Sequence, residues 1–411
     1  MVRSRQGSGA RQAGPIRGAI TVAVLGAIAL AGLAPEVRAE PYMALREGRK
    51  CSTCHVNMTG GGMRTLLANA HLEDITHYRD LFPGLADVDA FDGQVTSFFS
   101  VGADLRLDDS IVFQDAPDAA GQVPNHKVFR SRVDENVLGL SEAALYFLLK
   151  PVPDLLEIYL DQTFAPGGAT TREVFALMRG LLPWGGFLKG GQFYLDYGLR
   201  TANDDLFSQG GSGDEIFVRG RTGTSFTGYA QGAEIGIQPG PVFLSTSVTA
   251  ASDATAPRVT GNAYSVLRGV PVLDNVLAGG SFMWTPSAKI DQTEFALYAG
   301  TSWGPFEVQG EIDFIRLSGD LDGLPADSTL LYGEVNYLLL DWINTKAFAE
   351  WADNDGLPNS PDSAQNRFGF GVEPFLGRYL QTLLYYSIAN GPRNLPDANQ
   401  NRLVLELHVF L

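Results

Sequence analysis

The sequence predicts an all-β fold, a transmembrane antiparallel β-barrel of about 16 strands, preceded by a small N-terminal segment of helix and loop. Three features of residues 94–411 predict the barrel. Segments of roughly ten residues alternate apolar with polar or small side chains. Turn residues separate these segments, and the connections between them alternate between short and long. This pattern divides the chain into residues 1–39, 40–93 and 94–411.

Residues 1–39 have the features of an export signal. The apolar run Gly18–Ala34 follows a basic start, and Val37-Arg38-Ala39 offers a cleavage site before Glu40. A retained membrane anchor is the alternative, but the run is short for a membrane helix. The basic start consists of Arg3, Arg5, Arg11 and Arg17.

The chain is acidic, with a formal net charge of −16, and it becomes more acidic when the signal is removed. This charge argues against nucleic acid as a partner and suits cations and basic partner proteins. Simple solubility is the alternative explanation for most of the charge.

The motif with the most chemical content lies in residues 40–93. Cys51, Cys54 and His55 form C-x-x-C-H, the attachment signal for a c-type haem. The two thiols can add to the two vinyl groups of one porphyrin, and the histidine can bind the iron beneath the ring. A thioredoxin-like redox pair is the alternative, but it needs a βαβ setting that this sequence does not predict. We therefore expect one covalent haem c, with His55 as the proximal iron ligand.

The second axial position of the iron stays open among several side chains. The candidates in order of preference are His71, Met63 and His77, and a methionine would raise the reduction potential whereas a histidine would lower it. Three glycines at 60–62 let the backbone turn sharply or approach the ring closely, and a flexible hinge is the alternative. Two further methionines lie close to the motif, Met43 and Met58, the latter expected on the same side of the ring as His55.

The clearest strand pattern is Phe306–Leu317. Apolar or small residues at every second position would meet lipid, while the polar residues between them would line water. The polar set is Glu307, Gln309, Glu311 and Asp313. A soluble two-sheet sandwich is the alternative, but a packed core does not accept such ladders of charged groups. The expected strands are 95–107, 137–149, 155–164, 172–181, 186–195, 228–238, 242–251, 262–270, 275–285, 292–303, 306–317, 329–340, 345–352, 367–375, 379–389 and 402–411.

The lengths of the connections predict the orientation of the barrel in the membrane. Outer-membrane barrels have short periplasmic turns and long outer loops. Both ends of the barrel, and residues 40–93 with them, are therefore expected on the periplasmic side, where the haem segment would hang below the barrel or plug its mouth. The short connections are 151–154, 239–241, 304–305 and 376–378, and the long ones are 108–136, 196–227, 318–328, 353–366 and 390–401.

The layout of signal, single C-x-x-C-H and barrel resembles the fused monohaem cytochrome–porins of the bacterial outer membrane, which include iron-oxidising cytochromes. The local match is Cys51, Cys54 and His55 with the glycine turn after them. The acidophile iron oxidases carry a proline-rich stretch where this chain has Asn57–Gly62, which leaves the electron donor open. Residues Gly191–Arg200 look like a strand of phosphate-type porins, which says little about cargo.

Three functions remain open at this stage. The first is electron transfer across the outer membrane, between an extracellular metal ion such as Fe(II) and a periplasmic c-type cytochrome, with outer-membrane lipid around the barrel. This hypothesis includes an Fe(II)-oxidising or metal-reducing activity. The second is a solute-conducting porin in which the haem segment is a plug, anchor or sensor. The third is an enzyme that reduces peroxide or a nitrogen oxide at an open iron position.

Overall fold

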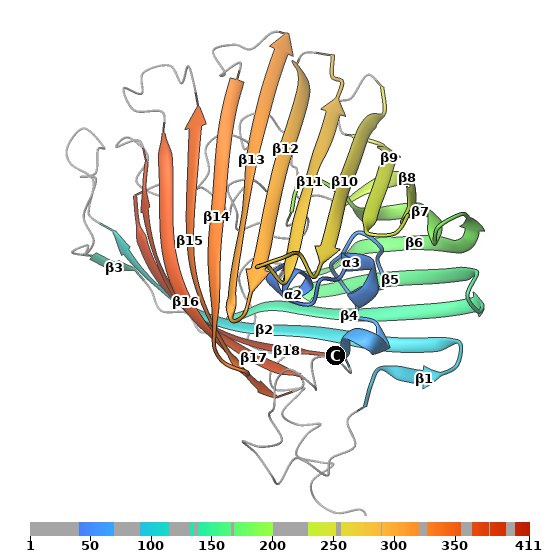
Figure 1. Ribbon diagram of the computed structural model, residues 1–411, viewed down its shortest axis with the longest axis horizontal. Helices are drawn as coiled ribbons and strands as arrows, with labels where there is room; N and C mark the ends of the chain where they lie inside the picture. The colour runs from blue at the N-terminus through green and yellow to red at the C-terminus, as the bar shows by residue number, and fades with distance from the viewer. Residues whose placement is uncertain are drawn as a thin grey trace, which may run out of the picture.

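The computed structural model describes residues 41–69, 91–114, 132–134, 139–165, 168–199, 229–251, 256–288, 290–319, 327–354, 364–377, 379–391 and 399–411. Its main feature is a closed β-barrel of 16 antiparallel strands (Figure 1). Each barrel strand pairs with the next one along the chain, and the last, β18, pairs with β2 and closes the cylinder. The predicted fold class and strand number are therefore confirmed.

The barrel strands are β2 (Phe99–Gln114), β4 (Gly139–Val152), β5 (Leu156–Ala165), β6 (Gly168–Leu182), β7 (Gly186–Tyr194), β8 (Tyr229–Ile237), β9 (Val242–Thr249), β10 (Arg258–Arg268), β11 (Asn275–Thr285), β12 (Ile290–Trp303), β13 (Phe306–Gly319), β14 (Asp327–Leu340), β15 (Ile343–Asn354), β16 (Gln365–Gly377), β17 (Leu380–Asn390) and β18 (Asn401–Phe410). Two short strands, β1 (Gln94–Thr96) and β3 (Arg132–Asp134), pair with β2. Each of the 16 expected segments overlaps one barrel strand, and the ends differ by several residues in many of them.

The first expected strand, 95–107, differs from the structure at both ends. A turn at Ser97 and Phe98 splits β1 from β2, and the Phe98 amide donates to the Thr96 hydroxyl at 3.3 Å. At the other end β2 continues to Gln114, because Asp108 and Asp109 pair with Glu406 and Leu405 of β18. The neighbouring strand keeps the backbone extended there, although the apolar alternation has ended.

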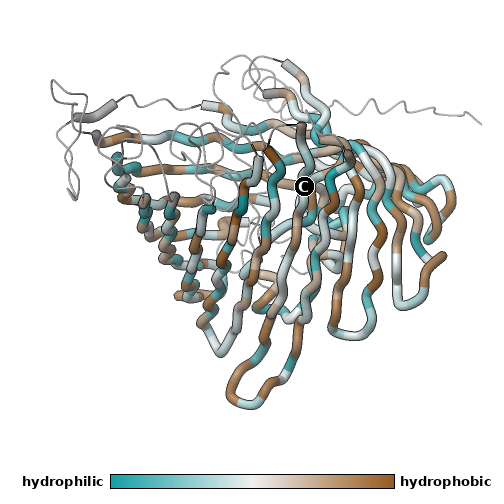
Figure 2. Tube along the Cα trace, turned by 90° about the horizontal axis from the view of Figure 1, so that it is seen from above, coloured by the Kyte–Doolittle hydropathy of each residue, from teal (hydrophilic) through white to brown (hydrophobic). Residues whose placement is uncertain are grey.

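Alternation along each strand separates the two faces of the barrel wall. In β13, Glu307, Gln309, Glu311 and Asp313 are all at most 4% exposed, whereas Phe314 on the opposite face is 44% exposed. The alternation of polar and apolar positions runs along the strands in Figure 2. The outer wall is apolar, as a surface facing lipid must be. The polar side chains of β13 are therefore on the lumenal face, where they are buried.

The described short turns gather at one end of the barrel. They include residues 183–185, 238–241 and 304–305, and both Trp184 and Gly185 take positive φ, of 56° and 65°. Aromatic side chains lie at this end. The ring centroids of the stacked pair Trp303 and Phe306 are 5.7 Å apart, and those of Phe306 and Tyr337 are 4.7 Å apart. Such a belt suits the boundary between lipid and water. No helix in the described ranges is long and apolar enough to cross a bilayer.

Candidate functional site

The lumen near the short turns holds residues 41–69, here called the lumenal segment. It contains two short helices, α2 (Pro41–Arg46) and α3 (Cys51–Cys54). Its side chains bond to inward-facing groups on opposite walls: Tyr42 to Glu373 of β16 at 3.0 Å, and Asn57 to Glu173 of β6 at 2.8 Å. Lys50 donates to the Gly240 carbonyl of the β8–β9 turn at 2.7 Å, which places the segment at the short-turn end. Figure 1 shows α2 and α3 in blue between the two walls.

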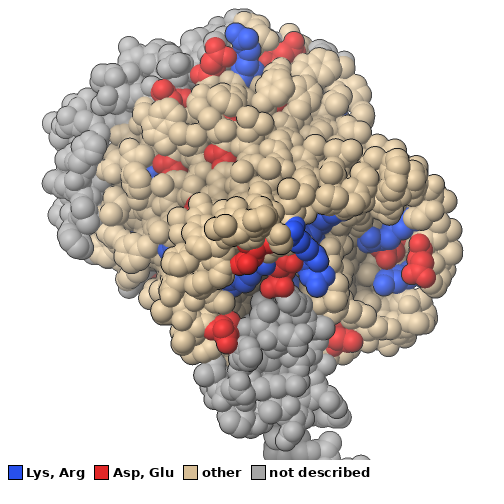
Figure 3. Space-filling view, in the orientation of Figure 1, with Lys and Arg blue, Asp and Glu red and all other residues tan. Residues whose placement is uncertain are grey.

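Charged side chains join the segment to the barrel at two places along its length. Arg46 donates to Glu307 of β13 at 2.5 Å, and Arg179 of β6 donates to the Val56 carbonyl at 3.1 Å. Lys189 of β7 is fully buried, donates to Asn57 at 3.0 Å and lies 2.7 Å from Glu234. Charged side chains gather around the position of α2 and α3 in Figure 3, whereas the outer strand surfaces carry few.

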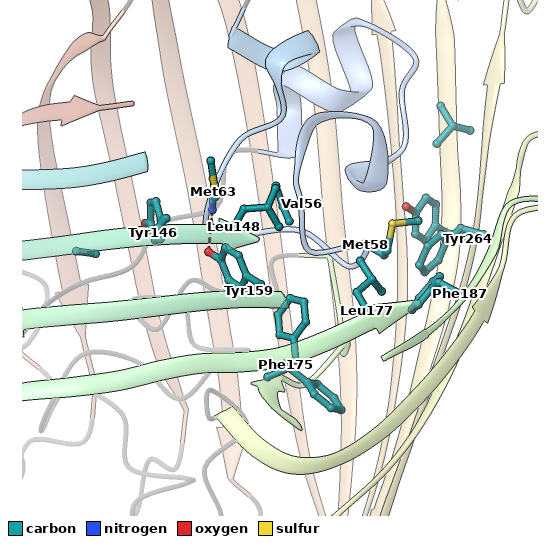
Figure 4. Close-up of a cluster of buried hydrophobic side chains, with 14 of the residues drawn as sticks. Val56, Met58, Met63, Tyr146, Leu148, Tyr159, Phe175, Leu177, Phe187 and Tyr264 are labelled. Carbon is teal, nitrogen blue, oxygen red and sulfur yellow. Dashed lines mark hydrogen bonds between the residues drawn. The ribbon is translucent and has the colours of Figure 1, made fainter. Parts of the chain in front are cut away.

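An apolar collar holds the middle of the lumenal segment. Val56, Met58 and Met63 are each at most 5% exposed and belong to one cluster with inward-facing barrel side chains. The Met63 amide donates to the Tyr159 hydroxyl at 3.0 Å, as the dashed line in Figure 4 marks. Burying such side chains stabilises the docked segment by about 1.5–3 kcal/mol each. The barrel members include Tyr146, Tyr159, Phe175, Leu177, Phe187 and Tyr264.

The three glycines at 60–62 form a tight turn. Their φ values are 103°, 77° and 61°, a region that favours glycine because it has no Cβ. The turn returns the chain antiparallel to itself, so that the Val56 amide donates to the Met63 carbonyl at 3.0 Å and the Thr65 amide to the Cys54 carbonyl at 2.9 Å. His55 and Arg64 are directly opposed in this bridge. Opposed residues project to the same face with Cβ atoms about 4.5–5.5 Å apart.

Cys51, Cys54 and His55 line one cavity between the lumenal segment and the barrel wall. About 1670 Å³ of space between atoms lies within this lining, and it includes space open to solvent. Its far wall is formed by inward-facing residues of β2, β4–β7 and β16–β18. The motif therefore faces open space inside the barrel.

The residues present fit a covalently attached haem. Both thiols are free and lie within the single turn of α3, and each of the three motif side chains is partly accessible. His55 Nδ1 is buried and makes no hydrogen bond, so a ring nitrogen is available for further bonding. Burial raises the pKa of the Cys51 thiol to about 11 and that of Cys54 above its usual value. Burial, with the nearby Arg64 charge, lowers the pKa of His55 to about 4, so its ring is neutral at pH 7, as an iron ligand must be.

The structure separates the candidates for the second iron ligand. Met63 does not line the cavity, because it neighbours Arg64 in the bridge and projects to the opposite face, where it packs near Gly102. Met58 is buried beside Arg179, and Met43 lines the cavity. His71 and His77 lie outside the described residues. The distal ligand, with His71, Met63 and His77 as candidates, stays a prediction.

Sequence reasoning missed the part of the cavity that the barrel supplies. His408 of β18 lines it, with Nε2 3.0 Å from Asp104 and Nδ1 3.1 Å from Gln381. Arg106 donates to Asp104 at 3.1 Å, and Arg172 pairs with Asp161 and Glu142. The only signal in the sequence was the position of these groups at alternate places in expected strands. Which of them would meet across the lumen depends on barrel closure.

A second segment also enters the lumen. Residues 195–199 leave β7 and bend inward, and Tyr197 donates from its hydroxyl to Asp313 of β13 at 3.1 Å. The Leu199 amide donates to Glu311 at 2.7 Å, and the Leu199 side chain lines the cavity. These residues extend from one wall to another and narrow the lumen beside the cavity. Within the described ranges no cluster of three or more His, Cys, Asp or Glu side chains could hold a metal ion.

Comparison with known proteins identifies the barrel fold. No protein-family model matches the chain, and no curated protein matches it. Among solved structures, OmpT of Vibrio cholerae is 12% identical over 77% of this chain and 99% of its own, with a TM-score of 0.53. The anion-selective porin from Comamonas acidovorans is 12% identical over 76% and 99%, with a TM-score of 0.55.

A third similar structure is OmpF of Salmonella typhi, solved with daunomycin. It is 8% identical over 76% of this chain and 97% of its own, with a TM-score of 0.54. At these identities the likeness is one of fold. This chain has the fold of the outer-membrane porins, and its lumenal segment carries the C-x-x-C-H motif.

Proposed function

We propose that this protein is an outer-membrane barrel that holds one haem c in its lumen and transfers electrons between an extracellular metal ion and a periplasmic cytochrome. Ferrous iron is the candidate donor. The observation that carries the proposal is that Cys51, Cys54 and His55 all line one cavity inside the barrel. A haem held there would supply one-electron chemistry. Cys51 and Cys54 would hold it through thioether bonds, and His55 would bind its iron.

The protein's own residues account for the position of this site. The lumenal segment is bonded to opposite walls, so the cavity keeps its place near the short-turn end, which we assign to the periplasm. The apolar collar around Val56 and Met58 excludes water from one side of the segment. The cavity opens toward the lumen on the other side, where a small metal ion could enter. Periplasmic proteins would meet the short turns.

A solute-conducting porin is the second candidate. The comparisons favour it over electron transfer, since the proteins of similar fold are porins and one is described as anion-selective. In that case the lumenal segment would be a plug, anchor or sensor. The bonds from this segment to both walls, together with the inward bend at 195–199, leave less open lumen than the barrel alone would have.

One reconstitution separates the two candidates. The protein is placed in liposomes that enclose an oxidised c-type cytochrome, Fe(II) is added outside, and reduction of the enclosed cytochrome is followed by absorbance. The double variant Cys51→Ser with Cys54→Ser is the matched control, because it keeps the barrel but removes both thioether bonds. Electron transfer predicts reduction with the wild type and little with the control.

Two results would reject the electron-transfer proposal. One is haem-containing protein whose absorbance does not respond to Fe(II) or any other external metal. The other is equal reduction with the wild type and with the double variant Cys51→Ser with Cys54→Ser, because the barrel would then simply pass Fe(II). Rapid swelling of the same liposomes in sugar solutions would support the porin candidate instead.

A further inference from the structure

Among the residues that the structure describes, Arg64 at the edge of the cavity has no acidic partner. Four arginines line this cavity: Arg46, Arg64, Arg106 and Arg172. Arg46 pairs with Glu307, Arg106 with Asp104 and Glu142, and Arg172 with Glu142 and Asp161. Among the described residues, no carboxylate pairs with Arg64.

The described carboxylate whose charge acts on Arg64 is already paired with other groups. Asp104 is the carboxylate whose charge acts most strongly on it, but Asp104 already accepts from Arg106 at 3.1 Å and lies 3.0 Å from His408 Nε2. The Arg64 guanidinium carbon instead lies 3.8 Å from the centroid of the Phe410 ring. A guanidinium held on an aromatic ring, with no carboxylate paired to it among the described residues, is a ready site for an anion.

The position of Arg64 relative to the motif is fixed by the backbone. It is opposed to His55 in the bridge that the glycine turn creates, so both side chains project to the same face and both line the cavity. A group bonded to Cys51 and Cys54 and bound by His55 would therefore lie in a cavity that Arg64 also lines. A haem carries two propionate carboxylates at one edge, and guanidinium binds carboxylates through paired, charge-assisted hydrogen bonds.

We propose that Arg64 binds a propionate carboxylate of the haem that Cys51 and Cys54 hold, and that its positive charge raises the reduction potential of the iron. The inference rests on the proposed function for the presence of the haem. It assigns to Arg64 a positioning role: the guanidinium fixes one edge of the ring, while the thioether bonds fix another. Its charge disfavours the ferric state, which carries one more positive charge than the ferrous state.

The test uses the full-length protein purified with its haem, and the reduction potential measured by optical redox titration. Arg64→Gln should shift the reduction equilibrium at least tenfold toward the ferric form, which is about 59 mV for one electron. Arg64→Lys keeps the charge, so its reduction equilibrium constant should lie within about threefold of the wild-type value. Arg49→Gln is the matched control, because Arg49 belongs to the same segment but does not line the cavity.

Each outcome decides the inference. If the reduction equilibrium constant of Arg64→Gln stays within twofold of the wild-type value, the inference is overturned. An equal shift with Arg49→Gln also overturns the inference, because the effect would then come from long-range charge alone. If Arg64→Gln does not fold, the resonance Raman band of the propionate in Arg64→Lys decides, and an unchanged band overturns the inference. Wild-type protein without haem overturns the proposed function as well, whereas haem with no effect of Arg64 overturns only the inference.

Discussion

Lys189 is the buried cation that joins the lumenal segment to the barrel wall, and its removal should be costly. Both Lys189 and Glu234 have side chains 0% exposed, and they lie directly opposite each other on β7 and β8 with Nζ 2.7 Å from Oε1. Lys189→Met leaves the Glu234 carboxylate buried without its counter-charge. Breaking a buried pair in this way destabilises a protein by about 3–5 kcal/mol. An exposed pair contributes only about 0–1 kcal/mol.

A double variant separates the ion pair from the contact with the segment. Lys189→Met with Glu234→Met removes both charges, so the penalty for an unpaired carboxylate disappears. The bonds from Lys189 to Asn57 and Thr59, at 3.0 and 3.4 Å, are still lost. We expect the double variant to be about 1–2 kcal/mol less stable than the wild type, since a hydrogen bond contributes about 1 kcal/mol net.

The assay is urea unfolding of the reconstituted barrel, followed by tryptophan fluorescence. Arg316→Met is the control, because Arg316 pairs with Asp327 at 3.3 Å while the two side chains are 75% and 59% exposed. It should change the free energy of unfolding by less than about 1 kcal/mol. The reasoning is refuted if Lys189→Met also stays within about 1 kcal/mol of the wild type, or if the double variant is as unstable as the single one.

Three further changes test other parts of the account. Gly62→Ala should weaken docking of the lumenal segment by about 1–3 kcal/mol. The reason is that φ at this position is 61° and an added Cβ would lie 2.3 Å from the Tyr159 hydroxyl. The rate at which a protease releases the segment measures this loss. Gly269→Ala is the control, because φ is 62° there but no atom lies within 4 Å of an added Cβ, so the loss of stability should be smaller. Equal release of the segment by protease in the two variants would contradict the clash with Tyr159. In haem-free protein at pH 8, Cys51 should be alkylated roughly a hundredfold more slowly than a thiol of ordinary pKa, because burial raises its pKa to about 11. The alkylation rate should rise with pH, and an ordinary rate at pH 8 would contradict the raised pKa of Cys51. Deleting residues 41–69 should raise ion conductance in planar bilayers, and unchanged conductance would mean that the segment does not narrow the pore.

The sequence predicted the barrel well because the barrel wall obeys a local rule. Period-two alternation marks each strand whatever its neighbours are, so segments such as Phe306–Leu317 could be recognised one at a time. Strand ends were harder, because pairing rather than composition extends them. Asp108 and Asp109 look like loop residues, yet β18 holds them in the ladder.

The motif was also evident in the sequence, but its surroundings were not. Nothing in the spacing of Phe175, Leu177 and Phe187 shows that they face inward to form a collar, since the expected lumen was polar. Their inward direction follows from the strand register, and their burial follows from the lumenal segment that packs on them. Met63 was a reasonable ligand candidate by distance along the chain. The bridge between His55 and Arg64 directs it to the other face, a consequence of the glycine turn.

The central claim is that a covalently bound haem occupies the lumen of a membrane barrel. Intact-mass spectrometry of the denatured protein, purified from the outer-membrane fraction, tests it most directly. The account predicts a polypeptide heavier by one haem with no thiol left to alkylate, because Cys51 and Cys54 are its only cysteines. The mass of the bare polypeptide with two reactive thiols would contradict it.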